Sequence, residues 1–239
     1  MKPRDFAAKY FVKRANYDRQ RQIQETSLDF LRYLTNSKAE YFQDLWVLRE
    51  TKSKNDGFFV EFGATNGIDA SNTWLLEKNY KWRGLVIEPN PIYREALCRN
   101  RDCMIDFRAI WDESGKQIEF MAMNEPYLSV AKEDLKAKNL LEDPYPKVLS
   151  LDTISLTDIL LEHNAPRFID FMSVDVEGSE ERILKPFFKS GKFEVNLMVV
   201  EHNWRDEQAS LLSLVMANGY ERVFAEHSSR DYWFKKIRS

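Results

Sequence analysis

The sequence predicts an α/β fold in which a mostly parallel β-sheet carries helices on both faces. Short, strongly apolar runs alternate with stretches of helical periodicity from about residue 58 onward. Four of these runs end in an acidic residue, and glycine, proline and asparagine separate the segments. This alternation is typical of parallel sheets, whose strands are buried on both faces and therefore apolar throughout. At 239 residues the chain fits one such domain with an added helical segment.

The first half begins with apolar residues at mostly helical spacing over 28–49, which predict one or two helices packed on the main domain. Asn55-Asp56-Gly57 supplies the turn into the first strand. The alternation then predicts strands over 58–62, 84–88 and 104–108, with helices near 71–79 and 91–99. Residues 117–123 are expected as an extra strand at an edge, and 124–146 as a loop with room for a helix around 132–139.

The second half predicts strands over 148–151, 167–174 and 195–200. Ser155 is expected to cap a helix over 155–162. A helix after the strand over 167–174 is expected to end near Pro186. A further helix is expected over 206–218 and is expected to end at Gly219. Strands over 222–225 and 232–235 are expected to form a closing hairpin. We divide the chain into an N-terminal helical extension, 1–55, and a main domain, 56–239.

The bulk composition excludes several classes. A net charge of -3 argues against general nucleic-acid binding. No apolar run approaches the roughly 20 residues that span a bilayer, and the N-terminus is too polar for a secretory signal. The two cysteines, Cys98 and Cys103, indicate packing rather than a disulfide or zinc site, hence a reducing, cytoplasmic setting.

Residues 1–24 carry seven basic and two acidic side chains, a local charge of 7 − 2 = +5. They are expected to form either a solvated arm or a contact surface. An anionic substrate, membrane headgroups or a partner subunit, including a second copy in a homo-oligomer, would suit such a surface.

An acid, a glycine loop and a second acid surround the first two strands. Glu61 leads into Gly63-Ala64-Thr65-Asn66-Gly67, and Glu88 lies 21 residues beyond Gly67. In α/β proteins such a loop lets backbone N–H groups approach an adenosine-bearing cofactor, and the second acid accepts hydrogen bonds from ribose hydroxyls. A dinucleotide-binding site has the pattern Gly-x-Gly-x-x-Gly, but Thr65 occupies the position of its middle glycine. Together with the carboxylate of Glu61, this favours a cationic ligand, S-adenosylmethionine.

Polar residues also follow two later apolar runs. Asp175 and Glu177 follow one, and Glu201, His202 and Asn203 follow the other. Since the carboxyl ends of parallel strands meet at one edge, these residues should converge with Glu61 and Glu88 where the strand order reverses. Carboxylates gathered there need cationic or hydrogen-bonding partners, which a cationic cofactor and a divalent metal would provide.

Each of these positions also has a structural interpretation. Glu61 and Glu88 could cap helices, and a lone histidine such as His202 is often a hydrogen-bonded core residue. Asp106 and Ala109, at the end of the third strand, could edge an adenine pocket. The two other histidines, His163 and His227, have no comparable setting and are expected at the surface.

Five segments together resemble the FkbM-type methyltransferase family over about residues 58–234. They are Val60–Ile68, Ser71–Thr73, Ile87–Asn90, Ser173–Glu180 and Val200–Asn203. The resemblance implies a class I, Rossmann-like, S-adenosylmethionine-dependent methyltransferase with a seven-stranded sheet whose last hairpin adds an antiparallel strand. It also implies O-methylation of a small-molecule or glycan acceptor: a sugar, a polysaccharide or a related natural product.

The resemblance assigns roles residue by residue. Glu61, Gly63 and Gly67 would line the methionine end, Glu88 would bind the ribose, and Asp106 and Ala109 would lie near adenine. The remaining expected cofactor contacts are Ala64, Thr65, Asn66, Asn72, Pro89 and Asp175. Some related sugar O-methyltransferases hold a divalent metal through acids after the fourth and fifth strands. The matching positions are Asp175, Glu201 and Asn203, oxygen donors as Mg²⁺ prefers. The Asp-Gly-x-His form of some relatives is missing.

Methyl transfer to a hydroxyl requires loss of its proton. His202 is the best general base by its ordinary pKa, with Asp175 and Glu177 as rivals, and a metal could instead acidify the hydroxyl. Two other functions compete: a non-catalytic scaffold of the same fold, and a nicotinamide-dependent oxidoreductase, which the missing middle glycine disfavours. The loop 124–146 and the N-terminal helices are the expected covers of the acceptor.

Overall fold

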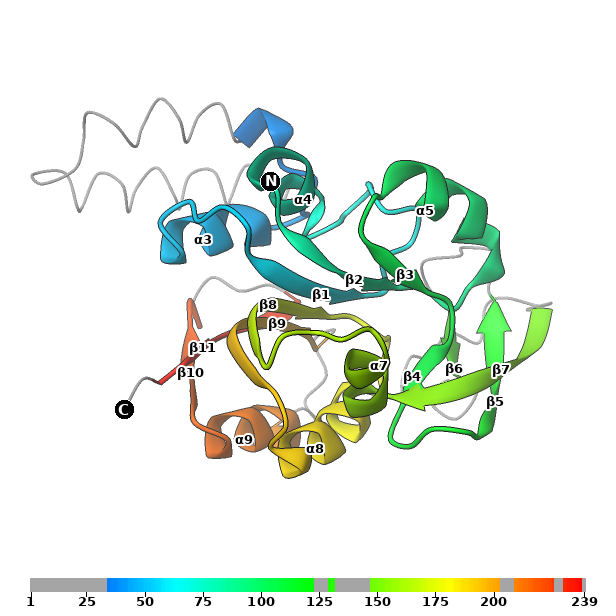
Figure 1. Cartoon of the computed structure of the whole chain (residues 1–239). Coiled ribbons are helices and arrows are strands. Elements are labelled where there is room, and N and C mark those ends of the chain that lie inside the picture. The colour runs from blue at the N-terminus through cyan, green and yellow to red at the C-terminus, as the bar shows by residue number, and fades with distance from the viewer. Residues whose placement is uncertain (1–33, 123–128, 132–146, 203–208, 226–229, 238–239) are drawn as a thin grey trace, which may run out of the picture.

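The structure is a computed structural model that describes residues 34–122, 129–131, 147–202, 209–225 and 230–237 (Figure 1). A seven-stranded sheet forms its centre. The strands are β1 (Phe58–Phe62), β2 (Arg83–Ile87), β3 (Met104–Asp106), β8 (Phe168–Val174), β9 (Glu194–Glu201), β10 (Tyr220–Val223) and β11 (Asp231–Lys236). Their order is β10-β11-β9-β8-β1-β2-β3, and only the pairings of β11 are antiparallel. The predicted α/β class, the mostly parallel sheet and the closing hairpin are confirmed.

Helices cover both faces of this sheet (Figure 1). One face carries α3 (Gln43–Glu50), α4 (Trp74–Tyr80) and α5 (Arg94–Asn100), the last preceded by a 3₁₀ turn, η1 (Pro91–Tyr93). The other face carries α7 (Leu156–Glu162), α8 (Glu180–Ser190) and α9 (Ala209–Ala217). Successive strand residues point to opposite faces, so Phe59 packs in the α3–α5 core whereas Val60 and Phe62 pack in the α7–α9 core. Both faces are therefore apolar, as the strand sequences indicated.

A second, four-stranded sheet lies beyond β3 and was not predicted (Figure 1). Its strands are β4 (Ala109–Trp111), β5 (Gln117–Ala122), β6 (Val130–Ala131) and β7 (Lys147–Ser155), in the order β4-β7-β5-β6. The strand expected over 117–123 forms as β5, but its expected edge position was wrong, because β5 is an inner strand of this second sheet and pairs antiparallel with both β7 and β6. The alternating exposure along β5 fits a strand with one solvated face.

Several local predictions are confirmed. The first strand has the predicted bounds, and the side chain of Ser155 caps α7 by accepting a hydrogen bond from the backbone N–H of Asp158 at 3.1 Å. The prediction that a helix ends near Pro186 was wrong, since α8 continues to Ser190. Burial of its apolar face, including Phe187 just after the proline, outweighs the missing backbone N–H. Residues 28–33, 132–139 and 206–208 of the predicted helices lie outside the described residues.

The segment before β1 shares a core with the sheet. Trp46 of α3 packs its ring edge-on to Phe171 at 6.5 Å and against Trp233 at 5.2 Å. Lys235 of β11 pairs with Glu50 at the end of α3 at 2.6 Å, so α3 also contacts β11. The division at residues 55 and 56 stays a prediction. Among the described residues, no helix combines the length and apolar character that a membrane crossing requires.

Candidate active site

The strand order reverses between β1 and β8, because β2 and β3 extend the sheet on one side of β1 and the later strands extend it on the other. Ligands of open parallel sheets bind beyond the strand ends at such a point. The chain after β1 and the chain after β8 come into contact there. A Cβ atom on Gly63 would lie 2.3 Å from the carbonyl oxygen of Asp175, and Gly63 has a φ of +69°. Both the close approach and the backbone angle require glycine.

The glycine loop is held against β2 and its acid. The N–H groups of Gly63 and Ala64 donate to the Ile87 carbonyl at 3.1 and 3.3 Å. Thr65 has a φ of +46°, which a β-branched residue rarely adopts, and its N–H donates to Glu88 at 2.9 Å. The side chain of Asn66 is used within the loop, where its Oδ1 accepts from two backbone N–H groups.

Glu88 is 5% exposed at the end of β2. Besides Thr65, the backbone N–H of Asn90 donates to it at 2.8 Å, across the intervening Pro89. Burial raises the pKa of Glu88 to about 7, the two backbone hydrogen bonds oppose that rise, and the negative charge of Asp175 adds to it. A carboxylate has about four lone-pair sites, so Glu88 retains capacity to accept hydrogen bonds from a ligand.

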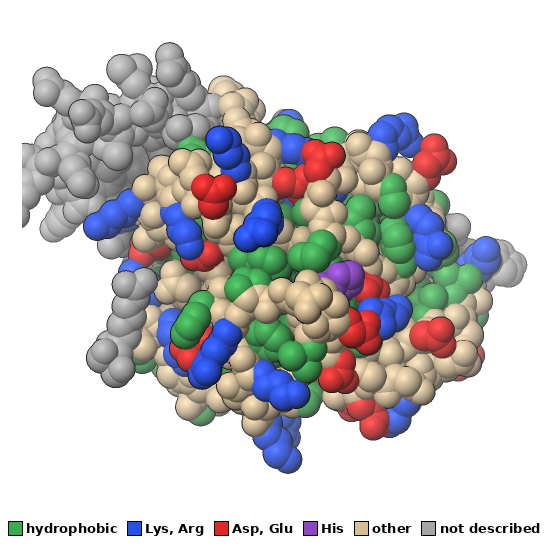
Figure 2. All heavy atoms as spheres, viewed as in Figure 1, with side chains coloured by type: hydrophobic (Ala, Val, Ile, Leu, Met, Phe, Trp, Pro, Cys, Tyr) green, Lys and Arg blue, Asp and Glu red, His purple; other side chains and the backbone are tan. Residues whose placement is uncertain are grey.

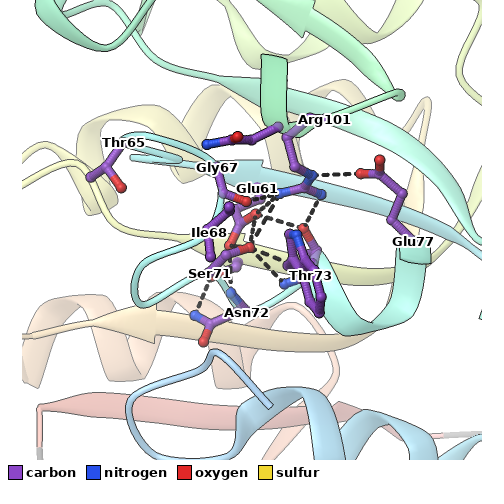
Figure 3. A network of polar contacts seen from close by, with 12 residues as sticks. Glu61, Thr65, Gly67, Ile68, Ser71, Asn72, Thr73, Glu77 and Arg101 are labelled. Atoms are coloured by element: carbon purple, nitrogen blue, oxygen red, sulfur yellow. Dashed lines mark hydrogen bonds and ion pairs between the residues drawn. The ribbon is translucent and has the colours of Figure 1, made fainter. Parts of the chain in front are cut away.

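Glu61 lies beneath the loop and is only 3% exposed (Figure 3). Its carboxylate accepts hydrogen bonds from Ser71, Thr73 and the Asn72 backbone and pairs with a buried arginine, Arg101, at 3.2 Å. The expectation that this charge calls for a cationic ligand needs correction, since Arg101 already compensates it. Direct contact between Glu61 and a cofactor stays a prediction.

Asn72 connects the two sides of the reversal point. Its backbone N–H donates to Glu61 at 2.6 Å, and its side-chain amide donates to Ser173 of β8 at 2.8 Å. The loop after β1 is therefore fixed both to its own strand and to the neighbouring one.

The end of β3 holds a charge cluster. Arg108 contacts Asp106 at 2.7 Å, and the Nε2 atom of His163 lies 3.0 Å from the same carboxylate. Burial alone would raise the pKa of Asp106, but its hydrogen bonds to Arg108 and His163 lower it to about 2. His163 was expected at the surface without a partner in the site. Instead, the end of α7 places its ring beside Asp106 at the end of β3. Ala109 is buried as the first residue of β4.

Three acids converge beyond β8 and β9. Carboxylate oxygens of Asp175, Glu177 and Glu201 all lie within 4.8 Å of one another. Glu177 has a φ of +63°, a conformation that non-glycine residues seldom adopt. Of the predicted metal ligands, the structure brings Asp175 and Glu201 together and adds Glu177, whereas Asn203 lies outside the described residues.

A further acid, Asp231, was not among the predicted site residues and pairs with Glu201 across β11 and β9. It is buried, and Gln43 at the start of α3 donates to it at 2.6 Å. Burial raises the pKa of Asp231 to about 7. The hydrogen bond from Gln43 opposes this rise, and the negative charge of Asp175 adds to it. The predicted hairpin strands, 222–225 and 232–235, left Asp231 out, so the sequence did not indicate that it lies opposite Glu201.

His202 follows Glu201 and is 8% exposed. Its ring stacks on Tyr232 with centroids 4.1 Å apart, and its backbone N–H donates to the Arg230 carbonyl at 2.7 Å. Burial and the charge of Arg222 lower the pKa of His202. The lowered pKa favours the neutral imidazole, which is the form that can accept a proton.

These features define a class. The antiparallel strand β11 lies between β10 and β9, a glycine loop lies at the reversal point, and an acid follows β2. Together these are the features of the class I methyltransferase fold. The chain matches the methyltransferase FkbM domain over residues 61–230 and belongs to that family. Family and fold imply use of S-adenosylmethionine.

The solved structures that resemble the chain are distant. Precorrin-6y C5,15-methyltransferase from Geobacter metallireducens is 12% identical, with 80% of this chain and 84% of that chain covered, at a TM-score of 0.41. The N-terminal domain of human METTL16 is 11% identical, with coverages of 82% and 68%, at a TM-score of 0.42. The fold assignment rests on the strand order and the family match rather than on these likenesses. No curated protein matches the chain.

Proposed function

We propose that the protein transfers a methyl group from S-adenosylmethionine to a hydroxyl of a sugar, glycan or related natural product. The observation that supports this is the juxtaposition of the Glu88 and glycine-loop site with three carboxylates at the same sheet edge. The nucleoside of the donor would lie on Glu88, and its methionine end would lie over the loop between β1 and β8. The methyl group would then face the acidic cluster.

The acidic cluster suits a neutral, hydroxyl-rich acceptor. Three carboxylates within 4.8 Å of one another repel a phosphate placed directly beside them, so the acceptor would present a hydroxyl to the cluster and keep any phosphate away from it. On the face shown in Figure 2, basic and acidic side chains are interspersed, which fits the same proposal. A basic surface is what nucleic-acid binding usually requires.

Catalysis would come mainly from alignment of the acceptor oxygen, the methyl carbon and the donor sulfur. His202, Asp175 or Glu177 would accept the hydroxyl proton, and the lowered pKa of His202 favours the neutral imidazole that this role requires. The three clustered carboxylates offer an all-oxygen donor set that fits a divalent cation such as Mg²⁺. Such a cation would acidify and orient an acceptor hydroxyl.

The test is incubation of the protein with labelled S-adenosylmethionine and a panel of nucleotide-linked sugars and glycans, with RNA and protein as comparison acceptors, each with and without a chelator. We expect label on a hydroxyl of at least one sugar acceptor. Label on RNA or protein alone would contradict the acceptor class. Failure to bind S-adenosylmethionine at all would instead favour a non-catalytic scaffold. The setting proposed is the cytoplasm, where the free thiols of Cys98 and Cys103 stay reduced.

A further inference from the structure

The glycine loop is held in place by a residue that is far away from it in the sequence. Arg101 follows the last residue of α5, 34 residues beyond Gly67, and its side chain is 0% exposed. Figure 3 shows its guanidinium pointing into the space enclosed by the loop and by the start of α4. Neither the glycine pattern nor the strand-end acids predict this residue.

The planar guanidinium contacts both sides of the loop at once. Its Nη1 atom lies 3.2 Å from Glu61 Oε2, 3.2 Å from Ser71 Oγ and 3.4 Å from the Gly67 carbonyl oxygen. Its Nη2 atom donates to Thr73 Oγ1 at 2.8 Å. One side chain thus ties the end of β1, the loop and the residue before α4 together, which a lysine ammonium could not do with the same geometry.

Gly67 is explained by the same side chain. A Cβ atom at this position would lie 2.7 Å from Arg101 Cγ and 2.8 Å from Leu97 Cδ1, and the φ of Gly67 is +83°. The loop therefore lies directly on the stem of Arg101. Gly67 is a glycine because the loop packs on Arg101, whether or not a ligand also approaches it.

The charges in this network depend on one another. On the side away from the loop, Arg101 Nε donates to Glu77 at 2.5 Å. Burial alone would raise the pKa of Glu77, but Arg101 and the neighbouring hydrogen bonds lower it. Loss of the guanidinium would leave two buried carboxylates facing each other across its site. Because repulsion between them would be relieved by moving Glu61 and the loop, the loop position is coupled to Arg101.

The loop position also sets the donor contacts. The N–H of Thr65 reaches Glu88 at 2.9 Å, and the neighbouring Asn66 carbonyl accepts from Asn100, the residue before Arg101, at 2.8 Å. We propose that Arg101 is a positioning residue for S-adenosylmethionine, which holds the glycine loop in its binding conformation through Glu61, Gly67, Ser71 and Thr73. This inference rests on the proposed placement of the donor.

The test compares Arg101→Met and Arg101→Lys with Val215→Ala, a core variant in α9 on the other face of the sheet. Calorimetry measures the Kd of S-adenosylhomocysteine, and thermal unfolding measures the Tm. If only a tenth of the loops remain in the binding conformation, the Kd of Arg101→Met rises about tenfold. Arg101→Lys should show a smaller rise, and Val215→Ala should bind as the wild type does despite its lower Tm.

Hydrogen exchange gives a second readout, since amides over 63–73 should exchange faster in the Arg101 variants than in Val215→Ala. Wild-type affinity in Arg101→Met, or in Arg101→Lys if the former does not fold, would reduce Arg101 to a structural role and overturn the inference while leaving the donor site intact. A wild-type protein that binds no S-adenosylhomocysteine would overturn the donor placement itself.

Discussion

Glu88 provides a direct test of the donor site through pH. Its carboxyl is buried and its pKa is raised from 4.5 to about 7. A raised carboxyl pKa means that the folded protein binds this proton more tightly than the unfolded chain does. The resulting stabilisation is complete below pH 4.5 and is lost as the pH rises through about 7.

The change is Glu88→Gln, which removes this titration. A carboxyl pKa raised from 4.5 to about 7 corresponds to roughly 3 kcal/mol, of which about 2–3 kcal/mol falls between pH near 5 and pH near 8. Between pH near 5 and pH near 8, the free energy of unfolding should fall by different amounts in the two proteins. The fall in the wild type should exceed the fall in Glu88→Gln by about 2–3 kcal/mol. In Glu88→Gln, the NH₂ group of the new side chain faces one of the two backbone N–H donors, and the lost hydrogen bond lowers stability. This loss does not change with pH.

The assay is urea unfolding of both proteins at the two pH values, with Glu95→Gln as control because the Glu95 side chain is 93% exposed. The same linkage applies to the donor. Ribose hydroxyls donate to the ionised carboxylate, so S-adenosylhomocysteine should bind the wild type about tenfold more weakly near pH 6 than near pH 8, and this pH dependence should vanish in Glu88→Gln. Equal pH slopes of unfolding in both proteins would refute the burial argument.

Three further variants test other parts of the site. Gly63→Ala places a Cβ atom 2.3 Å from the Asp175 carbonyl oxygen at a φ of +69° and should cost about 2–4 kcal/mol in urea unfolding, so a wild-type midpoint would contradict the close approach. Arg101→Met should lower the free energy of unfolding by about 3–5 kcal/mol, because it leaves buried carboxylates unpaired; a loss below about 1 kcal/mol would show that the network is relaxed. Asp175→Ala should abolish turnover in the labelled-donor assay while the donor Kd stays within about tenfold, and equal loss of both would remove Asp175 from catalysis.

The positions of the main strands along the chain and the donor edge could be predicted because each depends on local pattern. The apolar runs that end in Glu61, Glu88 and Glu201 are buried strands, and Gly63 after the first run is required by its positive φ and its close approach to the Asp175 backbone. The three-carboxylate cluster followed because parallel strands carry their ends to one edge. Even so, Glu177 belongs to that cluster by a backbone turn with positive φ that the sequence did not indicate.

The partners of the predicted residues could not be predicted. Arg101 lies 40 residues after Glu61, at the end of a helix where a basic side chain is ordinarily solvated. Its burial depends on how α5 packs over the loop, which no periodicity reports. The same holds for His163 beside Asp106 and for Gln43 beside Asp231. The second sheet escaped prediction because its strands β4 and β6 are three and two residues long.

The central claim is that S-adenosylmethionine binds across the reversal of strand order between β1 and β8. A crystal structure with bound S-adenosylhomocysteine tests it most directly. The account predicts both ribose hydroxyls within hydrogen-bonding distance of Glu88, with the amino-acid end over the glycine loop toward Asp175. A nucleoside bound elsewhere, or a Glu88 carboxylate turned away from the ribose, would contradict it.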